Sequence, residues 1–257
     1  MELDEKRYAI FLDIDGTLMG NSHQSLRKNF DVIQKVRSLG HKVFINTGRS
    51  TAFLPAEIDI EKYFDGVISG AGSRIVLDGE EVFCKMLDIK KVRSFCEFCM
   101  DIEDICILEG TEKMFFVGLQ TEGVYDWDCI SPENIDEYIN DDLKIEKLTI
   151  LGTAPSGLKS VLGEDYLFLQ HKTYAEIIQK SCTKAGAMDI VLKKLGFSKA
   201  QSIAMGDSLN DFDMIENSAI GVAMGNAIPE IKNIAKIITD DVNNAGVAKA
   251  LEKIFGI

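Results

Sequence analysis

The sequence predicts an α/β protein with a doubly wound, Rossmann-like parallel-sheet core and an inserted α+β cap domain. Short apolar strands alternate with amphipathic helical segments at both ends of the chain, which is typical of a parallel sheet covered on both faces. The alternation stops after residue 80 and resumes near residue 183, and the stretch between mixes strands and helices in another order. We therefore expect a core of residues 1–80 and 183–257 and an inserted cap of residues 81–182.

The expected elements of the first core segment follow from apolar runs and turn residues. Continuous apolar runs predict buried strands, and an amphipathic period closed by Gly40 predicts the first helix. Asp78-Gly79-Glu80 is typical of a hairpin turn. The segment should contain strands at 8–12, 42–46 and 66–69, a helix at 25–38, and a hairpin of 74–77 with 81–85.

Strands and helices are expected to follow one another in a different order in the inserted region than in the second core segment. The cap should contain helices at 88–103, 132–139 and 156–162 and strands at 105–109, 114–119, 146–151, 165–169 and 174–179. After it, the core should resume with helices at 185–195, 209–216 and 245–254 and a strand at 202–205.

Two aspartates follow the first strand directly. The apolar run that ends at Leu12 leads straight into Asp13-Ile14-Asp15-Gly16-Thr17. Open α/β sheets bind their ligands at the carboxyl ends of their strands, so we expect both aspartates there. Two residues apart on an extended chain, they point to the same side and can share one reacting group or one cation. An Asx turn with Gly16 at positive φ is an open alternative.

A second acidic loop lies near the other end of the chain. The expected strand at 202–205 runs into Gly206-Asp207-Ser208-Leu209-Asn210-Asp211. If both strands belong to one parallel sheet, the two loops meet at one edge, where close like charges are unfavourable without a cation. Carboxylate oxygens of this kind suit Mg²⁺. The predicted metal-binding residues are Asp13, Asp15, Asp207 and Asp211.

Three further polar residues lie between these loops. The strand at 42–46 ends in Thr47-Gly48-Arg49, and Lys184 opens an expected helix. A lysine at a helix N-terminus is unfavourable against the helix dipole, which favours a functional role for Lys184. Structural readings stay open: a helix cap for Thr47, a solvated cation for Lys184 and a surface ion pair for Arg49.

These motifs resemble those of the haloacid dehalogenase-like hydrolases, and among them the Cof-like phosphatases with a large cap. Residues 13–17 are similar to the first motif, Thr47-Gly48-Arg49 to the second, Lys184 to the third, and Gly206-Asp207 with Asn210-Asp211 to the fourth. The stretches 222–227 and 246–248 are similar to the end of Cof-like chains. In one departure, Ala71-Gly72-Ser73 stands where many relatives have Asn-Gly-Ala, which puts the polar contact of that asparagine in question.

The resemblance implies a Mg²⁺-dependent phosphatase acting on the phosphate monoester of a small metabolite, such as a sugar phosphate or a cofactor phosphate. Asp13 would attack phosphorus to give an aspartyl-phosphate, and Asp15 would protonate the leaving oxygen and later deprotonate water. The metal would be held by Asp13, Asp207, Asp211 and the backbone carbonyl of Asp15. The phosphate would be held by Thr47, Gly48, Lys184, Asn210 and main-chain N–H groups near Ile14.

Two alternatives to the phosphatase remain open. A phosphomutase of the same superfamily would have to hold a second phosphate from the cap, usually by bidentate arginine. Residues 81–182 contain a single arginine, Arg93, in an expected helix, although Lys113, Lys144 and Lys147 could supply a weaker grip. A non-catalytic phospho-acceptor or binding module is disfavoured, because an acceptor alone has no use for a general acid such as Asp15.

The composition agrees with a soluble enzyme. The 257 residues are 46% hydrophobic, and no apolar run approaches the roughly 20 residues that cross a bilayer. The N-terminus lacks a signal-peptide profile, so we expect a cytoplasmic protein, either a monomer or a weak homo-oligomer. A net charge of −13 disfavours nucleic acid and anionic membranes as partners.

The remaining conspicuous side chains have structural explanations. The six cysteines are expected to be reduced thiols, and Cys96 and Cys99 fit the apolar face of a helix better than a zinc or redox site. Trp127 is expected to complete a small core more readily than to stack on a substrate. The three histidines lie in unrelated segments and form no triad signature.

Overall fold

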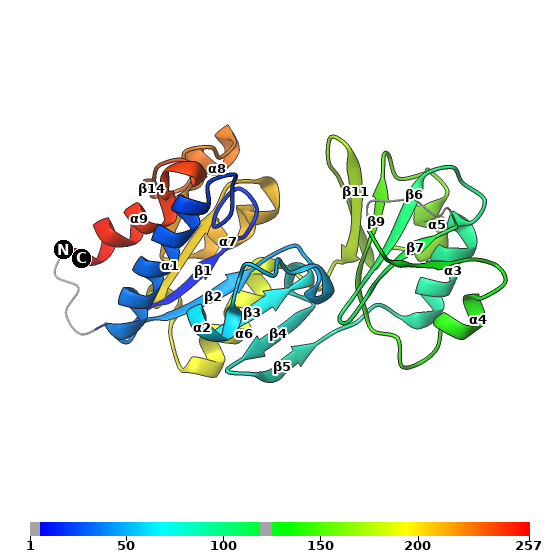
Figure 1. Cartoon of the computed structure of the whole chain (residues 1–257), viewed down its shortest axis with the longest axis horizontal. Coiled ribbons are helices and arrows are strands. Elements are labelled where there is room, and N and C mark those ends of the chain that lie inside the picture. The colour runs from blue at the N-terminus through cyan, green and yellow to red at the C-terminus, as the bar shows by residue number, and fades with distance from the viewer. Residues whose placement is uncertain (1–5, 119–124) are drawn as a thin grey trace. The chain divides into compact units, whose positions relative to one another are not determined.

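The computed structural model describes residues 6–118 and 125–257, which form two compact units (Figure 1). The core unit contains residues 6–48, 56–83 and 183–257, and the inserted unit contains residues 49–55 and 84–182. The segment 49–55 thus packs with the inserted unit, although it lies within the first core segment of the sequence. The last residues of the strand expected at 114–119 lie outside the described residues.

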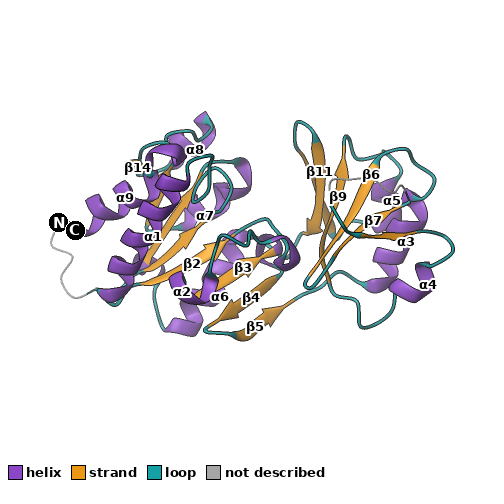
Figure 2. Cartoon of the chain, in the orientation of Figure 1, coloured by secondary structure: helices purple, strands orange, loops and turns teal. Residues whose placement is uncertain are grey.

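The core unit is built on an eight-stranded sheet of mainly parallel strands (Figure 2). The last two strands form the expected hairpin, in which Asp78 and Gly79 have φ values of 47° and 81°. In spatial order the strands are β14 (Ile237–Ile238), β13 (Ile220–Ala223), β12 (Ser202–Gly206), β1 (Ala9–Leu12), β2 (Lys42–Asn46), β3 (Gly66–Ser69), β4 (Arg74–Leu77) and β5 (Glu80–Cys84).

Strand β1 lies at the centre of this sheet. It pairs in parallel with both β2 and β12, and Leu12 is in register with Ile45 and with Met205. The carboxyl ends of these three strands therefore lie side by side. This arrangement confirms the predicted doubly wound, parallel-sheet core.

Helices bury both faces of the core sheet. Helix α6 packs its apolar residues on the face that carries Ala9, Phe11 and Phe44, and the alternating residues Ile10 and Leu12 are also buried. Helices α1 and α9 pack on each other. The helices of this unit are α1 (His23–Ser38), α2 (Ile60–Tyr63), α6 (Lys184–Leu195), α7 (Phe212–Asn217), α8 (Pro229–Ile234) and α9 (Gly246–Phe255).

The inserted unit has a six-stranded sheet with its own hydrophobic core. Helices cover one face of this sheet, and Cys96 and Cys99 lie on the buried side of α3, as predicted. The strand order is β10 (Tyr166–Gln170), β11 (Tyr174–Gln179), β9 (Ile145–Leu151), β6 (Ile105–Gly110), β7 (Met114–Val117) and β8 (Asp128–Ile130). The helices are α3 (Ile89–Cys99), α4 (Ile135–Tyr138) and α5 (Leu158–Leu162).

The segment 49–55 packs on the other face of this sheet. The Thr51 backbone N–H donates to Glu146 over 3.0 Å, and the Thr51 hydroxyl donates to the same oxygen over 2.5 Å. Phe53 joins a small apolar cluster around Phe116 that also includes Trp127. Trp127 thus contributes to a small core, as the sequence indicated.

Two predicted helices of the inserted unit are shorter than expected. Helix α3 ends at Cys99 instead of continuing to residue 103, because the acidic residues that follow are unfavourable at a helix C-terminus. The helix expected at 132–139 is reduced to the single turn α4, since Asn134 closes a turn by accepting from the Ser131 N–H. Among the described residues, no helix combines the length and the apolar character needed to cross a membrane.

Candidate active site

A buried lysine lies between two aspartates at the carboxyl edge of the core sheet. The Lys184 ammonium donates to Asp13 Oδ1 over 2.7 Å and to Asp211 Oδ1 over 2.5 Å. Its side chain is 1% exposed, so the reading of Lys184 as a solvated helix-start cation is wrong. A buried ammonium is stable only when paired, and these two carboxylates pair it.

The local structure at the start of α6 presents Lys184 to the carboxylates. Thr183 is the N-cap, and its hydroxyl accepts from the Gly186 N–H over 3.0 Å. Gly72 lies against Thr183, because a Cβ at residue 72 would come within 2.5 Å of the Thr183 carbonyl oxygen. The helix start is therefore held by its own cap and by the loop after β3.

Backbone groups of the second acidic loop hold the Asp211 carboxylate. Asp211 Oδ2 accepts from the N–H groups of Asp207 and Ser208, at 2.9 and 3.1 Å. Gly206 allows the approach, since a Cβ there would lie 2.4 Å from the Asp211 side chain. Asn210 instead accepts from the Ser208 hydroxyl at 2.9 Å. The loop thus fixes Asp211 before any ligand binds.

Three of the predicted metal-binding residues form one cluster. Oxygen atoms of Asp13, Asp207 and Asp211 all lie within 4.8 Å of one another. The Thr17 hydroxyl donates to Asp207 Oδ1 at 3.5 Å. Clustered carboxylate oxygens at a sheet edge are the donor set that Mg²⁺ prefers, so the residues present fit this ion.

The cluster shifts the pKa values of its members. Burial, and then the charge of Asp211, raise the pKa of Asp207 from 3.8 to about 7. The same two causes raise the pKa of Asp13 well above its ordinary value, against the opposing effect of Lys184. For Lys184, burial alone lowers the pKa, but Asp13 and Asp211 outweigh burial and raise it. Such shifts are typical of functional sites.

Asp15 differs from Asp13 in its surroundings. Asp13 is 4% exposed, whereas Asp15 is exposed. The sequence predicted an extended chain through these two aspartates, but the chain turns here. The N–H groups of Thr17 and Met19 both donate to the Ile14 carbonyl. Gly16 has a φ of 76°, the positive value that the turn alternative gave it. The turn leaves Asp13 at the cluster and Asp15 beside it at the surface.

The second motif occupies the next strand end. Thr47 is buried directly after β2, its N–H donates to the Ile68 carbonyl, and its carbonyl accepts from the Ala71 N–H. Thr47 caps no helix, since the next helical turn begins after Ser50. Arg49 belongs to the inserted unit, where its guanidinium donates to the Phe53 carbonyl and lies 4.8 Å from the Phe53 ring centre.

Sequence reasoning missed Asn46, the last residue of β2. Its side chain is fully buried and donates to the Lys184 carbonyl over 3.1 Å. Its Oδ1 is buried and has no hydrogen-bond partner among the described residues. The sequence signal for Asn46 was an amide at the end of an otherwise apolar strand. A buried amide needs hydrogen-bond partners, whereas an apolar residue at that position would not, so the amide points to a specific role.

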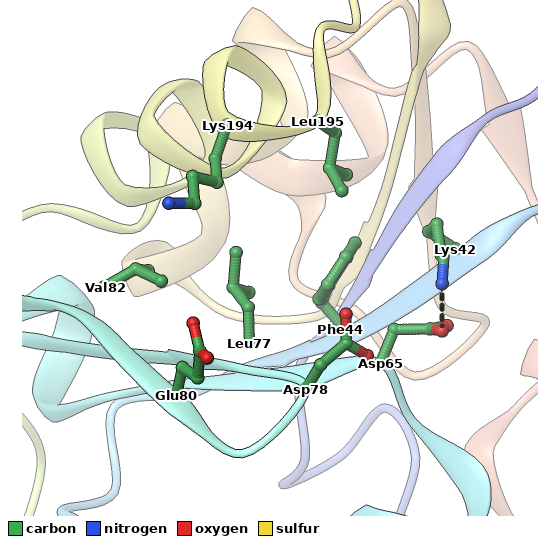
Figure 3. A pocket seen from close by; sticks show the side chains of 9 residues that line it. All are labelled: Lys42, Phe44, Asp65, Leu77, Asp78, Glu80, Val82, Lys194 and Leu195. Carbon is green, nitrogen blue, oxygen red and sulfur yellow. Dashed lines mark hydrogen bonds and ion pairs between the residues drawn. The ribbon is translucent and has the colours of Figure 1, made fainter.

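A separate cavity of about 380 Å³ lies at the opposite edge of the core sheet (Figure 3). Lys42 at the start of β2 and Lys194 at the end of α6 border it, whereas the acidic cluster lies at the end of β1 and the start of α6. Lys42 is bonded to Asp65 there, as drawn in Figure 3. The cavity shares no residue with the acidic cluster, so it is not part of the candidate active site.

Comparisons with known proteins agree with this arrangement. The family model of the haloacid dehalogenase-like hydrolases matches residues 10–251. A "putative phosphatase" of Haemophilus influenzae is 36% identical over 96% of this chain and 98% of its own length. The 5-amino-6-(5-phospho-D-ribitylamino)uracil phosphatase YcsE of Bacillus subtilis is 28% identical over 97% of this chain and 96% of its own length. The solved structure of BT1666 from Bacteroides thetaiotaomicron superposes with a TM-score of 0.81 at 25% identity, covering 100% of this chain and 98% of that one.

Proposed function

This chain belongs to the haloacid dehalogenase-like hydrolases, and we propose that it is a phosphatase that hydrolyses small phosphate monoesters through an aspartyl-phosphate on Asp13. The observation that carries the proposal is the buried Lys184 ammonium between Asp13 and Asp211 at the edge of the parallel sheet. The Lys184 ammonium offsets the repulsion between the two carboxylates and so favours the ionised form of the Asp13 carboxylate and holds it in place.

Asp13 acts as the nucleophile. Lys184 donates to Oδ1 and so restrains the carboxylate, and Oδ2 would present a lone pair to phosphorus. The P–O bond to Asp13 forms as the bond to the leaving oxygen breaks, and water later cleaves the acyl phosphate to release inorganic phosphate. Lys184 also lies where negative charge develops on the transferred group.

Asp15 acts as the general acid and base. It donates a proton to the leaving oxygen in the first step and accepts one from the attacking water in the second. Its exposed position allows it to exchange that proton with solvent and leaving group. A buried carboxylate already bonded to lysine, such as Asp13, could not serve in this way.

Magnesium is the proposed cofactor. Asp13, Asp207 and Asp211, with the backbone carbonyl of Asp15, would hold the ion, and its charge would neutralise the phosphate and the carboxylates around it. The remaining phosphate contacts are assigned to Thr47, Gly48 and Asn210 and to the main-chain N–H groups near Ile14.

The inserted unit is proposed to select the substrate. In β9, Leu148 and Ile150 belong to the core under the helices, so Lys147 and Thr149, which alternate with them, lie on the other face. Lys147 there pairs with two buried carboxylates, Glu109 at 3.2 Å and Glu176. Two carboxylates around one ammonium do not attract a second anion.

This polar face favours an uncharged, hydroxyl-rich leaving group. Glu109 Oε2 is buried and has no hydrogen-bond partner among the described residues, so it can accept from a hydroxyl or an amino group. A ribityl chain, as in the substrate named for YcsE, or a sugar has such groups. The substrate class proposed here is therefore a sugar or polyol monophosphate.

The same contacts argue against the phosphomutase. Its cap cations would have to be available for a second phosphate, but Arg93 pairs with Asp136 at 2.9 Å and Lys113 with Asp128 at 3.4 Å. Lys147 is committed to Glu176 and Glu109. Of the cations named from the sequence, this leaves the exposed Lys144, and a single flexible lysine is a weak support for phosphoryl return to a second hydroxyl of the bound sugar.

Rapid quench with intact-mass measurement tests the mechanism. We expect Asp13→Asn to abolish both turnover and covalent phosphate on an aryl phosphate. Asp15→Asn should still form the aspartyl-phosphate with this good leaving group and hydrolyse it slowly. Covalent phosphate on Asp13→Asn would show that the roles are misassigned. Covalent phosphate on the wild type and on Asp15→Asn but not on Asp13→Asn, with no turnover in the wild type, would favour a phospho-acceptor.

A further inference from the structure

The turn after β13 contacts both acidic loops of the core. The Asn226 side-chain amide donates to the Gly16 carbonyl over 2.8 Å, directly after Asp15. Two residues on, the Ile228 N–H donates to the Asp207 carbonyl over 3.0 Å. One short turn is thus bonded to the loop that carries Asp15 and to the loop that carries Asp207.

Both ends of the Asn226 amide are used. Its Oδ1 accepts from the Val242 N–H over 2.9 Å while its Nδ2 donates to Gly16. A backbone N–H on one side and a backbone carbonyl on the other allow only this orientation of the amide. Asn226 therefore bridges the Gly16 turn to the segment before α9.

The same C-terminal segment holds the far end of the Gly16 turn. The Asn21 N–H donates to Asn243 Oδ1 over 2.7 Å, and the Ser25 hydroxyl donates to the Asn243 carbonyl. The loop from Gly16 to Asn21 is therefore restrained at its start by Asn226 and at its end by Asn243.

Gly16 needs such a restraint more than most residues. Gly16 has a φ of 76°, and glycine populates positive and negative φ about equally, so the residue itself does not hold this conformation. Asp15 is exposed, so close packing does not fix the direction of its carboxyl group. A larger residue cannot replace Gly16, because its Cβ would lie 2.3 Å from Asp207 Oδ2. Hydrogen bonds to the backbone of this turn contribute to its geometry.

We propose that Asn226 is a positioning residue that holds the Gly16 carbonyl and thereby aims the Asp15 carboxyl at the leaving oxygen. This inference rests on the proposed role of Asp15 as general acid. It separates two functions within the site: Lys184 fixes the nucleophile Asp13, and Asn226 fixes the acid. Loss of Asn226 should then impair proton donation and leave attack by Asp13 intact.

Leaving-group dependence distinguishes positioning of the acid from a general loss of structure. A nitrophenolate leaves without a proton, whereas an alkoxide needs one. The measurement is kcat/KM of the Mg²⁺-loaded enzyme for 4-nitrophenyl phosphate, phenyl phosphate and glycerol 1-phosphate. For Asn226→Ala we expect a loss of about tenfold or more on the alkyl ester and of less than about threefold on the nitrophenyl ester.

Two further variants sharpen the comparison. Asn226→Asp keeps the acceptor for the Val242 N–H but cannot donate to Gly16, so it should show the same pattern as the alanine variant. Asn217→Ala removes an exposed amide that donates to the Asp213 carbonyl within the same helix, and it should match the wild type on all three esters. Thermal unfolding of each variant, with and without Mg²⁺, checks that the fold is retained.

Asp15→Asn, measured on the same esters, separates failure of the inference from failure of the proposed function. If Asp15→Asn shows the leaving-group dependence and Asn226→Ala loses activity equally on all esters or not at all, Asn226 is no positioning residue and the function stands. If Asp15→Asn itself shows no dependence, Asp15 is not the general acid, and both the assigned role and this inference are overturned.

Discussion

Asp207 is the residue whose ionisation connects metal binding to stability. Its pKa of about 7 in the folded, metal-free protein lies above the value of about 3.9 of an unfolded aspartate. Between those two values the folded state keeps a proton that the unfolded chain has lost. Its contribution to the free energy of unfolding is therefore full below about pH 4 and is lost as the pH rises to about 7.

Metal binding should show the opposite trend with pH. Mg²⁺ competes with the proton for Asp207, so its stabilising effect should grow as the pH approaches 7. The prediction is that the unfolding temperature of metal-stripped protein, measured relative to that of Asp207→Asn, decreases as the pH is raised from 5 to 7. Added Mg²⁺ should restore the unfolding temperature most strongly near pH 7. The shift corresponds to a few kcal/mol at most, by the relation of about 1.4 kcal/mol per pKa unit.

The difference between wild type and Asp207→Asn reports Asp207 together with its effect on Asp13, whose pKa is raised by burial, by Asp211 and also by the charge of Asp207. A difference that grows more favourable to the wild type as the metal-free sample is brought from pH 5 to 7 would contradict the prediction. Equal stabilisation by Mg²⁺ in both proteins would place the ion elsewhere.

Ala71 has a backbone conformation that is unusual for alanine. Its φ of 55° lies in the left-handed region, which asparagine and glycine tolerate better than alanine. The Ala71 N–H still donates to the Thr47 carbonyl over 3.0 Å. The resemblance put the polar contact of an asparagine at this position in question, and Ala71 contacts the second motif through its backbone.

At the scale of elements, the N-cap of α6 connects helix stability to the site. The prediction is that Thr183→Ala destabilises the protein by about 1 kcal/mol and also lowers kcat, because Lys184 is the next residue and loses its fixed start. Thr183→Ser keeps the capping hydroxyl and serves as the matched control, with both quantities near the wild type. Chemical denaturation and steady-state kinetics on an aryl phosphate measure the two effects.

The outcome for kcat decides the interpretation. An unchanged kcat in Thr183→Ala, despite the loss of stability, would show that Lys184 is held by Asp13 and Asp211 alone. A loss of kcat in Thr183→Ser as large as in the alanine variant would point to steric effects instead of the cap.

Elements with a clear hydrophobic period were predictable from the sequence. Strands β2 and β3 have the predicted bounds, and α1 and β1 differ from them by one or two residues at their starts. The elements that were not predicted, α2, α8, β8, β13 and β14, have at most six residues each. A period cannot be recognised over so few residues, and tertiary contacts decide such segments.

The candidate site was partly predictable for a related reason. Asp13, Asp207, Asp211 and Lys184 lie at ends of long apolar or helical runs, and the parallel sheet brings such ends together. Asn46 and Asn226 act through hydrogen bonds to backbone groups far away in the sequence. Their signals in the sequence are indirect, an amide that ends the apolar strand 42–46 and a stretch 222–227 that resembles Cof-like chains, and the bonds themselves are seen in the folded structure.

At the scale of the whole molecule, the inserted unit is a compact body with its own sheet and core. The two chain segments that lead into and out of it are bonded to each other, since Lys85 donates to the Ser181 hydroxyl and Gln179 donates to the Lys85 carbonyl. A short linker can therefore replace residues 84–182. Phe53 should be changed to serine in the same protein, because its apolar partners leave with the inserted unit.

The prediction is that this excised core folds, is stabilised by Mg²⁺ and hydrolyses aryl phosphates, but no longer discriminates among sugar and polyol phosphates. Relative kcat/KM values across a panel of esters measure the discrimination. The full-length Phe53→Ser protein is the control for the second change. Selectivity equal to that of the full chain would show that the inserted unit takes no part in choosing the substrate.

The central position of β1 has a consequence for the order in which the protein matures during synthesis. Its neighbour β2 emerges from the ribosome after a single helix, but its other neighbour β12 emerges only after the whole inserted unit has been made. Because domains fold as units while the chain grows, the inserted sheet can close first, beside a half-built core whose Asp13 still lacks Lys184 and Asp211. A chain that stops early therefore carries a finished inserted sheet, an open edge along β1 and no catalytic centre.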